Sequence, residues 1–291
     1  MTTTKNSIYK SYFIYLHTLP IRIMHWINVL CFIVLLMSGL NIFNAHPALN
    51  LGKSSYNNHA PILEMRAIQT DNGKFMGVTN IFGHDFNTTG VFGLSEDPDG
   101  RVLQRGFPSW MTLPSSQWLS MARRWHFFFA WLFVTNGICY ITYSFLTKHV
   151  QRDLITTQKD RASIWQSIKD HVRFRHPSGE AAIAYNVLQK FAYLSVIFIL
   201  LPLVILMGMA MSPFLDSLIP GWIDLFGGRQ TARTIHFIVA WLLVAFVFIH
   251  VFEVIITGVW NNLRSMITGQ YRIETHINSS EKQEAKHGTY I

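Results

Sequence analysis

The sequence predicts an all-α membrane protein, a four-helix transmembrane bundle with a long outer loop that contains short strands. Half of its 291 residues are hydrophobic and 14% are charged, whereas soluble domains carry roughly 25% charged residues. The apolar residues gather in four stretches, and each reaches the length of about 20 residues that crosses a bilayer. Two cysteines exclude a disulfide framework and an all-cysteine metal centre.

The apolar cores of the four predicted spans comprise residues 23–43, 125–146, 191–214 and 235–260. Histidines aside, Glu253 is the only acid or base inside these cores. The first core is too long for a cleavable signal peptide and lacks a small-residue cleavage site, so we expect it to be retained. Pro202 predicts a kink in the third span, because proline removes a helical N–H donor.

The distribution of lysine and arginine predicts the orientation, because short cytoplasmic loops carry an excess of both. The net charge is +8, and basic residues concentrate before the first span, between the second and third, and after the fourth. We therefore expect both termini to be cytoplasmic. The predicted segments are a cytoplasmic N-terminus 1–22, spans 23–43, 119–147, 191–214 and 229–260, periplasmic loops 44–118 and 215–228, a cytoplasmic loop 148–190 and a cytoplasmic tail 261–291.

Two turn signals predict that the outer loop 44–118 is a folded cap with short strands. Asp71-Asn72-Gly73 lies between two mixed apolar runs and indicates a hairpin. Asp97-Pro98-Asp99-Gly100 indicates a second turn. In the cytoplasmic loop, apolar residues at helical spacing within 164–172 predict an amphipathic interfacial helix, and the polar tail after residue 277 is expected to be disordered.

Four histidines lie at or within the spans, namely His25, His126, His236 and His250. His236 and His250 are 14 residues apart on the fourth span, so they share nearly one helix face and are separated by roughly 21 Å along it. His25 opens the first span at its cytoplasmic end, and His126 opens the second span at its outer end. The depths therefore predict two pairs, His25 with His250 and His126 with His236.

Two stacked pairs of imidazoles inside a four-helix bundle suit two haems with two axial histidines each. Any one of these histidines, taken alone, could be a hydrogen-bonded packing residue. The arrangement of all four favours a role as metal ligands. A zinc site lacks its third and fourth ligands at either level. A proton relay would use carboxylates more freely. Glu253 is compatible with a proton-handling group for a quinone, although its position favours an acid at the cytoplasmic surface.

Small and basic residues add to this interpretation without deciding it. Small residues in the spans would let a porphyrin approach the backbone, or they serve ordinary helix packing. Arginines at the outer ends of the spans run against the charge bias, which indicates an anionic partner there or interfacial snorkelling. The small residues are Ser38, Gly39, Gly137, Gly208 and Ala240, and the arginines are Arg123, Arg124, Arg229 and Arg233.

The motifs around the four histidines resemble the bacterial cytochrome b561 group, which contains the di-haem cytochrome b subunits of nickel–iron hydrogenase, formate dehydrogenase and thiosulfate reductase. The motifs are His25-Trp26, Arg124-Trp125-His126, Thr234-Ile235-His236 and His250-Val251. The resemblance implies that these four histidines ligate two b haems in the bacterial inner membrane. It also implies that electrons pass between the membrane quinone pool and a periplasmic redox partner.

Finer features resemble a subgroup whose members work with a periplasmic molybdopterin oxidoreductase of the sulfite-oxidase type. These features lie at residues 185–190, 226–230, 266–269 and 271–272. The resemblance makes Asn186 and Gln189 a candidate quinone site, although both also suit the polar end of a helix. It makes the four outer arginines candidate partners of haem propionates. The long first outer loop departs from the smaller members of the wider family.

The sequence therefore predicts a di-haem membrane subunit that carries electrons between the quinone pool and an oxidoreductase docked on the 44–118 loop. Paired histidines fill both axial positions of an iron, so such haems act as relays. One alternative is a stand-alone quinone or superoxide oxidoreductase of the b561 type. Another is a haem-binding membrane anchor or assembly protein. A transporter is disfavoured, because the spans show no clear inverted repeat.

Overall fold

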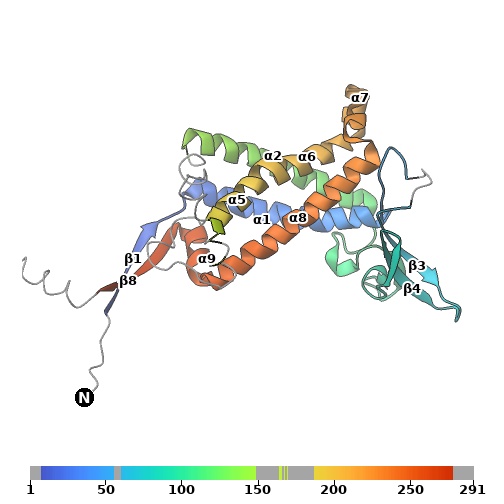
Figure 1. The fold of residues 1–291 in the computed structure, drawn as a ribbon, viewed down its shortest axis with the longest axis horizontal. Coiled ribbons are helices and arrows are strands. Elements are labelled where there is room, and N and C mark those ends of the chain that lie inside the picture. The colour runs from blue at the N-terminus through green and yellow to red at the C-terminus, as the bar shows by residue number, and fades with distance from the viewer. Residues whose placement is uncertain are drawn as a thin grey trace, which may run out of the picture. The chain divides into compact units, whose positions relative to one another are not determined.

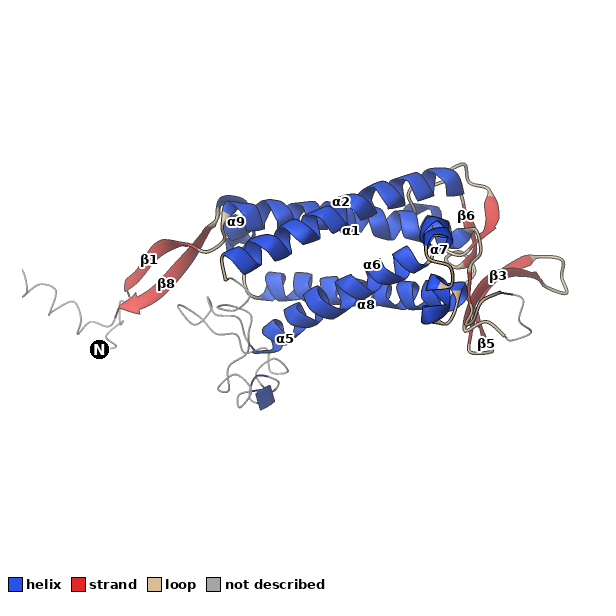
Figure 2. Ribbon diagram, turned by 90° about the horizontal axis from the view of Figure 1, so that it is seen from above, coloured by secondary structure: helices blue, strands red, loops and turns tan. Residues whose placement is uncertain are grey.

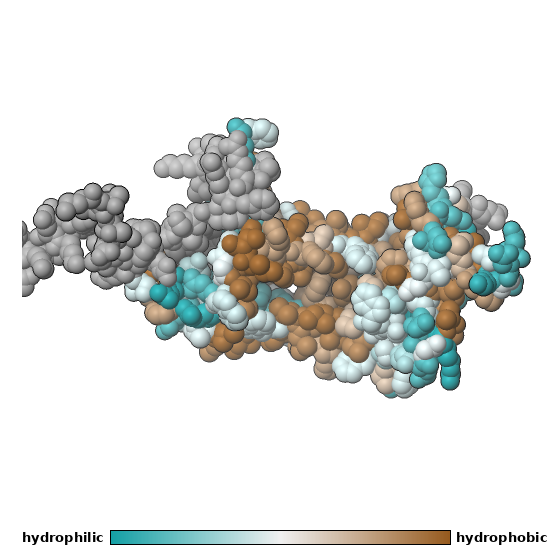
Figure 3. Space-filling view, turned by 90° about the horizontal axis from the view of Figure 1, so that it is seen from below, coloured by the Kyte–Doolittle hydropathy of each residue, from teal (hydrophilic) through white to brown (hydrophobic). Residues whose placement is uncertain are grey.

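The structure, a computed structural model, describes residues 8–55, 60–148, 164, 165, 167, 169 and 187–277. Four helical segments are long and apolar enough to cross a membrane, and apolar residues gather over the helices (Figure 3). Together with the strands of the outer loop, these segments confirm the predicted fold class. They are Leu19–Asn44, Leu119–Leu146, Val187–Ala210 and Arg229–Ile256.

Three of these spans are single helices, α1 (Leu19–Asn44), α2 (Leu119–Leu146) and α8 (Arg229–Ile256). The third is composite. It runs through α5 (Val187–Ser195), the π-helical turn η4 (Val196–Leu200) and α6 (Leu201–Ala210). Pro202 has no N–H to donate to the carbonyl of Phe198, so the regular ladder is broken. The helix is therefore interrupted where the proline predicts a kink.

The chain divides into two compact units. We call Met24–Tyr143 with Ser195–Phe246 the bundle unit. We call the remainder, Met1–Ile23 with Ser144–Leu194 and Val247–Ile291, the terminal unit. The bundle unit contains most of the helices and the whole outer loop, whereas the terminal unit contains the segments nearest both chain ends.

Within the bundle unit, α1 packs beside α2 and α6 beside α8, as Figures 1 and 2 show. Buried Cys31 and Val34 of α1 cluster with Phe129 of α2. Buried Met207 and Ala210 of α6 cluster with Ala232 of α8. A third cluster joins the end of α1 to the outer loop and comprises Leu40, Phe43, Leu49, Met65 and Phe107.

The outer loop forms the predicted cap of short strands. A four-stranded sheet has the order β2-β3-β4-β5 and a separate pair consists of β6 and β7. The bounds are β2 (Ala48–Leu49), β3 (Leu63–Gln69), β4 (Phe75–Ile81), β5 (His84–Asn87), β6 (Gly93–Glu96) and β7 (Val102–Arg105), followed by the short 3₁₀ helix η1 (Ser109–Met111).

Both turn predictions in the cap are confirmed. β3 and β4 form an antiparallel hairpin, and Gly73 adopts the left-handed φ of 75° in its turn. The turn between β6 and β7 is closed by the Asp97 carboxylate. Its Oδ1 accepts the backbone N–H groups of Asp99 at 2.9 Å and Arg101 at 2.8 Å.

Side chains of the helices bind the main chain of the cap. Asn41 of α1 donates to the Pro114 carbonyl at 2.6 Å. Thr234 of α8 donates to the Asn50 carbonyl at 2.7 Å. Because these bonds satisfy buried carbonyls of irregular backbone, the cap is an integral part of the bundle unit.

Arg105 at the end of β7 is the largest fully buried side chain, with 0% of its surface exposed. Its Nε donates to the Phe107 carbonyl at 2.8 Å, and Nη2 donates to Thr112 Oγ1 at 3.1 Å and the Ser115 carbonyl at 3.0 Å. Burial lowers the pKa of the Arg105 guanidinium, against the opposing effect of the Asp97 charge. The buried Arg105 guanidinium thus ties the end of β7 to three positions within residues 107–115 of the cap.

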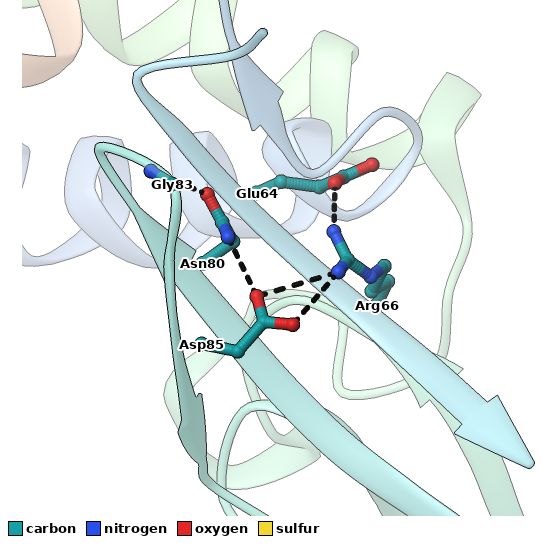
Figure 4. Close-up of polar contacts among 5 residues, drawn as sticks. All are labelled: Glu64, Arg66, Asn80, Gly83 and Asp85. Atoms are coloured by element: carbon teal, nitrogen blue, oxygen red, sulfur yellow. Dashed lines mark hydrogen bonds and ion pairs between the residues drawn. The ribbon is translucent and has the colours of Figure 1, made fainter.

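A polar network fixes the turn between β4 and β5 (Figure 4). Arg66 bridges Glu64 at 2.5 Å and Asp85 at 3.1 Å. Asn80 donates to Asp85 at 2.6 Å and accepts the Gly83 N–H at 3.1 Å. The side chains of Arg66, Glu64 and Asp85 are 34%, 33% and 48% exposed. Ion pairs with this much exposure add little stability, so the main effect of the network is to hold the shape of this turn.

The terminal unit contains a strand pair that the sequence analysis did not predict. β1 (Ile8–Tyr15) pairs antiparallel with β8 (Gln270–Ile277), which follows the short helix α9 (Val259–Thr268) (Figure 1). Gly269 between α9 and β8 has a φ of 85° and packs so closely on Tyr15 that a Cβ would lie 2.5 Å from its ring.

Three further predicted segments are the loop between the third and fourth spans, the amphipathic helix and the C-terminal tail. The outer loop between the third and fourth spans holds two short helices, α7 (Pro213–Leu218) and the 3₁₀ helix η5 (Trp222–Phe226). The amphipathic helix predicted within 164–172 lies largely outside the described residues, and the tail after residue 277 lies wholly outside them.

Candidate functional site

The structure brings together His126 of α2 and His236 of α8, the pair predicted for the outer end of the bundle. Their ring centroids are 6.2 Å apart and their planes meet at 63°. The two helices place these residues at matching positions, each about two turns after the start of its helix.

Hydrogen bonds define which nitrogen of each ring carries the proton. His236 Nδ1 donates to the Val204 carbonyl at 2.8 Å, since a carbonyl can only accept. Ser38 donates to the Val34 carbonyl at 2.6 Å, so its oxygen accepts from His126 Nδ1 at 3.1 Å. Both rings therefore carry the proton on Nδ1 and keep the lone pair of Nε2 for a metal.

Two glycines make room for these rings. A Cβ at Gly39 would lie 3.3 Å from Cε1 of His126, and a Cβ at Gly208 would lie 3.3 Å from Cε1 of His236. Nothing lies within 4 Å of a Cβ at Gly137. From the sequence, these small residues would either admit a porphyrin or serve helix packing, and the structure shows Gly39 and Gly208 against the imidazoles.

The two outer histidines fit an iron bound between them. A metal–imidazole bond is about 2 Å long and the ring centre lies ~1 Å further, so two rings facing across one ion have centres roughly 6 Å apart. The observed 6.2 Å agrees with this spacing. Among the described residues no group of three or more His, Cys, Asp and Glu is arranged to hold a metal ion. A haem iron needs only two protein ligands, since the porphyrin supplies the others.

The second predicted pair falls in two different units. His25 belongs to the bundle unit and His250 to the terminal unit, so their pairing stays a prediction. His25 contacts the Trp26 ring edge-on at 5.5 Å. His250 is partly buried on α8.

Near His250, α5 and α8 of the terminal unit bring an amide, a carboxylate and a phenol together. Gln189 donates to Glu253 Oε2 at 3.1 Å. Tyr193, one turn after Gln189 on α5, lies within electrostatic reach of the same carboxylate. Glu253 is partly buried rather than a fully exposed acid. Asn186 lies outside the described residues. Tyr193 was not among the predicted site residues, although its spacing of four residues from Gln189 already placed the two on one helix face.

The four outer arginines occupy different surroundings. Arg233 donates to the carbonyls of Ala48, at 3.0 Å, and of His46. Arg229 donates to the Met211 carbonyl at 3.0 Å. Arg123 lies over the Phe127 ring at 5.5 Å and is exposed, as is Arg124. Their role as propionate partners stays a prediction.

Arg233 also acts on a neighbouring histidine of the cap. Burial and the Arg233 charge lower the pKa of His46, and the Glu64 charge opposes them. His46 is thus favoured in its neutral form at the junction between the cap and α8.

A comparison with protein families identifies the family of this chain. The model of a family described as prokaryotic cytochrome b561 matches residues 16–269. A relative from Azospira oryzae, named as a putative protein-methionine-sulfoxide reductase subunit YedZ1, is 30% identical over 150 residues. That match covers 46% of this chain and 65% of the relative, slightly less than two thirds of its length. No solved structure matches the chain.

Proposed function

This chain belongs to the prokaryotic cytochrome b561 family, and we propose that it carries electrons across the membrane through two haem b groups. It is a multi-pass membrane haem b protein, as its family and its four candidate spans indicate. Haem supplies reversible one-electron chemistry when it is bound. The observation that carries the proposal is the facing pair His126 and His236, each with Nδ1 bonded and Nε2 available.

We assign one haem to each pair of histidines. His126 and His236 would hold the outer haem, and His25 and His250 the inner one. The 14 residues between His236 and His250 support this assignment, because one helix then presents a ligand at each level. Two imidazoles on one iron leave no open position for oxygen or substrate, so these residues make a relay rather than a reaction centre.

Quinone is the proposed electron carrier at the inner level. Gln189, Glu253 and Tyr193 offer hydrogen-bonding groups of the kind that bind a quinone carbonyl or a quinol hydroxyl. Asn186 joins this set by its position in the sequence. In this role, Gln189 would orient the quinone ring and Glu253 would hold a proton at its carboxylate oxygen.

The proposed partner is a periplasmic oxidoreductase, of the molybdopterin-dependent kind that the sequence resemblance implies. The matched relative is named as a subunit of a reductase, which supports a role in a complex. The cap is the proposed docking face, because it joins α1 to α2, the helix that carries His126, and is hydrogen-bonded to α1 and to α8, the helix that carries His236. With both termini in the cytoplasm, the cap would face the periplasm.

Haem content tests the assignment of ligands. The purified chain should contain two low-spin b haems by the pyridine haemochrome assay. Each of His126→Ala and His250→Ala should lose one haem, because a lost axial ligand leaves the iron held from one side only. His84→Ala on the exposed strand β5 is the matched control and should keep both.

Two results would count against the proposal. A single haem in the unaltered chain would remove the transmembrane relay and leave one histidine pair as packing residues. No haem at all would leave a membrane anchor in place of an electron carrier.

Quinol-driven reduction tests the inner site. Gln189→Ala and Glu253→Gln should slow reduction of the haems by a quinol roughly tenfold or more, because the first removes a hydrogen-bonding amide and the second removes the carboxylate that would hold the proton. Reduction by dithionite should be unaffected, since it needs no quinone site. Gln69→Ala on the cap is the control, and equal rates in all variants would exclude this site.

A further inference from the structure

The ring of each outer histidine packs against a glycine of the adjacent helix, and we call each such glycine position a notch. His126 lies against Gly39 of α1, and His236 lies against Gly208 of α6. The Val204 carbonyl, four residues before Gly208, accepts the Nδ1 proton of His236. Leu35, four residues before Gly39, likewise turns its carbonyl toward His126. Each notch thus combines a glycine with the carbonyl one turn earlier.

One residue makes the notches different. The position before the glycine is Ser38 in the α1 notch and Met207 in the α6 notch, exposed by 0% and 2% respectively. Ser38 Oγ lies 3.1 Å from His126 Nδ1. A methionine sulfur is only a weak acceptor, so within the described part of the chain the hydrogen bond of His236 Nδ1 is the one to the Val204 carbonyl.

The direction of the Ser38 hydrogen bonds determines their effect on the basicity of the His126 imidazole. The hydroxyl gives its proton to the Val34 carbonyl at 2.6 Å, and donation of this kind makes the oxygen a stronger acceptor. A stronger acceptor at Nδ1–H raises the basicity of Nε2. A more basic ligand stabilises ferric iron relative to ferrous iron.

We propose that Ser38 is a positioning residue that fixes the ring of His126 and lowers the reduction potential of the iron bound to it. The proposal rests on the proposed function and adds to it a residue that controls one haem of the two. The hydroxyl holds the ring by a directional bond, whereas Gly39 only provides space. Ser38 therefore sets the energy of the outer haem relative to the inner one.

An optical redox titration of Ser38→Ala tests this proposal. The midpoint potential of one haem should rise, and the second haem serves as the reference within the same molecule. The electron paramagnetic resonance g-values of the affected haem should change as well, because the ring loses its fixed orientation. Ser38→Thr keeps a hydroxyl at this position and should restore both signals.

Ser144→Ala is the matched control, since Ser144 is also 0% exposed and its hydroxyl has no hydrogen-bond partner in the described part of the chain. It should change neither signal. Unchanged potentials and g-values in Ser38→Ala, with both haems bound, would overturn the proposal and leave the proposed function intact. Loss of one haem in both the alanine and the threonine variants would trace the effect to packing and also overturn it. A chain without haem would contradict the proposed function itself.

Discussion

At the scale of single residues, the outer site depends on what surrounds each imidazole more than on the histidines alone. Ser38 and the Val204 carbonyl select the same tautomer for His126 and His236. The alternative tautomer would direct an Nε2–H at a metal, which excludes ligation. The spacing of histidines in the sequence predicts the ligands. The groups that bond Nδ1 of each ring leave Nε2 unprotonated and able to bind a metal.

The glycines beside the imidazoles give a direct prediction. Gly39→Ala and Gly208→Ala should each reduce the content of the outer haem to about half or less, because a Cβ at 3.3 Å displaces a ring already held at Nδ1. Haem per chain by pyridine haemochrome measures the effect. Gly137→Ala, which meets nothing within 4 Å, is the control. Full haem content in all three variants would contradict the notch geometry.

Buried Arg105 predicts a large effect on the cap. Arg105→Ala removes three hydrogen bonds that tie the end of β7 to residues 107–115, and the loss of each costs about 0.5–1.5 kcal/mol. The cap should become sensitive to limited proteolysis, and the chain should unfold at a lower temperature. Arg101→Ala in the exposed turn after β6 is the control for loss of charge. Equal protease resistance in the two variants would count against Arg105 as an organising residue.

His46 predicts a pH dependence at the junction of the cap and α8. Because its folded pKa is lowered from 6.5 by burial and Arg233, its protonation favours the unfolded cap. The stability it contributes is complete above pH 6.5 and declines as pH falls toward the folded pKa. The protection factors of the cap amides in hydrogen exchange, which correct for the pH dependence of the intrinsic rate, should therefore be lower at pH 5 than at pH 7.5. His46→Gln should reduce this difference, and an unchanged difference would assign the effect to other groups.

At the scale of elements, the strand pair β1 and β8 joins segments from opposite ends of the sequence. Such pairing requires both segments on the same side of the membrane, in agreement with the four candidate spans that the described residues contain. Periodicity does not reveal this pair, because a two-stranded ribbon buries little apolar surface of its own. Its position next to α9 gives it the packing that it needs.

The register of this pair can be tested by cross-linking. Phe13 lies opposite Arg272, and both side chains are exposed. In a background carrying Cys139→Ser, the double variant Phe13→Cys with Arg272→Cys should form a disulfide on mild oxidation, because directly opposed strand residues lie within bridging distance. Phe13→Cys with Gln270→Cys is two residues out of register and should cross-link far less, as judged by mass spectrometry. Equal yields would contradict the register.

At the scale of the whole molecule, the orientation is a prediction from charge that labelling can decide. β1 precedes α1 and the cap follows it, so a spanning α1 separates them across the membrane. In the same Cys139→Ser background, an impermeant thiol reagent should label Phe82→Cys in intact spheroplasts and Phe13→Cys only after lysis. Both side chains are more than half exposed. The reverse pattern would place the cap, and with it the proposed partner, in the cytoplasm.

The sequence by itself determined the four candidate spans, the turns of the cap and the positions of the four candidate histidine ligands along the helices. These features follow from local composition and from the period of the helix, so they need no knowledge of contacts. Asp71-Asn72-Gly73 specifies its hairpin, and Pro202 marks the interruption of the third span, for the same reason.

Only the tertiary structure decided which groups meet these residues. The Ser38 partner of His126, the burial of Arg105, and the pairing of β1 with β8 all join segments far apart in the chain. A hydrogen bond forms only when donor and acceptor are placed to within a few tenths of an ångström. Composition and residue spacing do not give positions to that precision. The sequence therefore named the candidate ligands, and the packing of α1, α2, α6 and α8 decided how two of them are held.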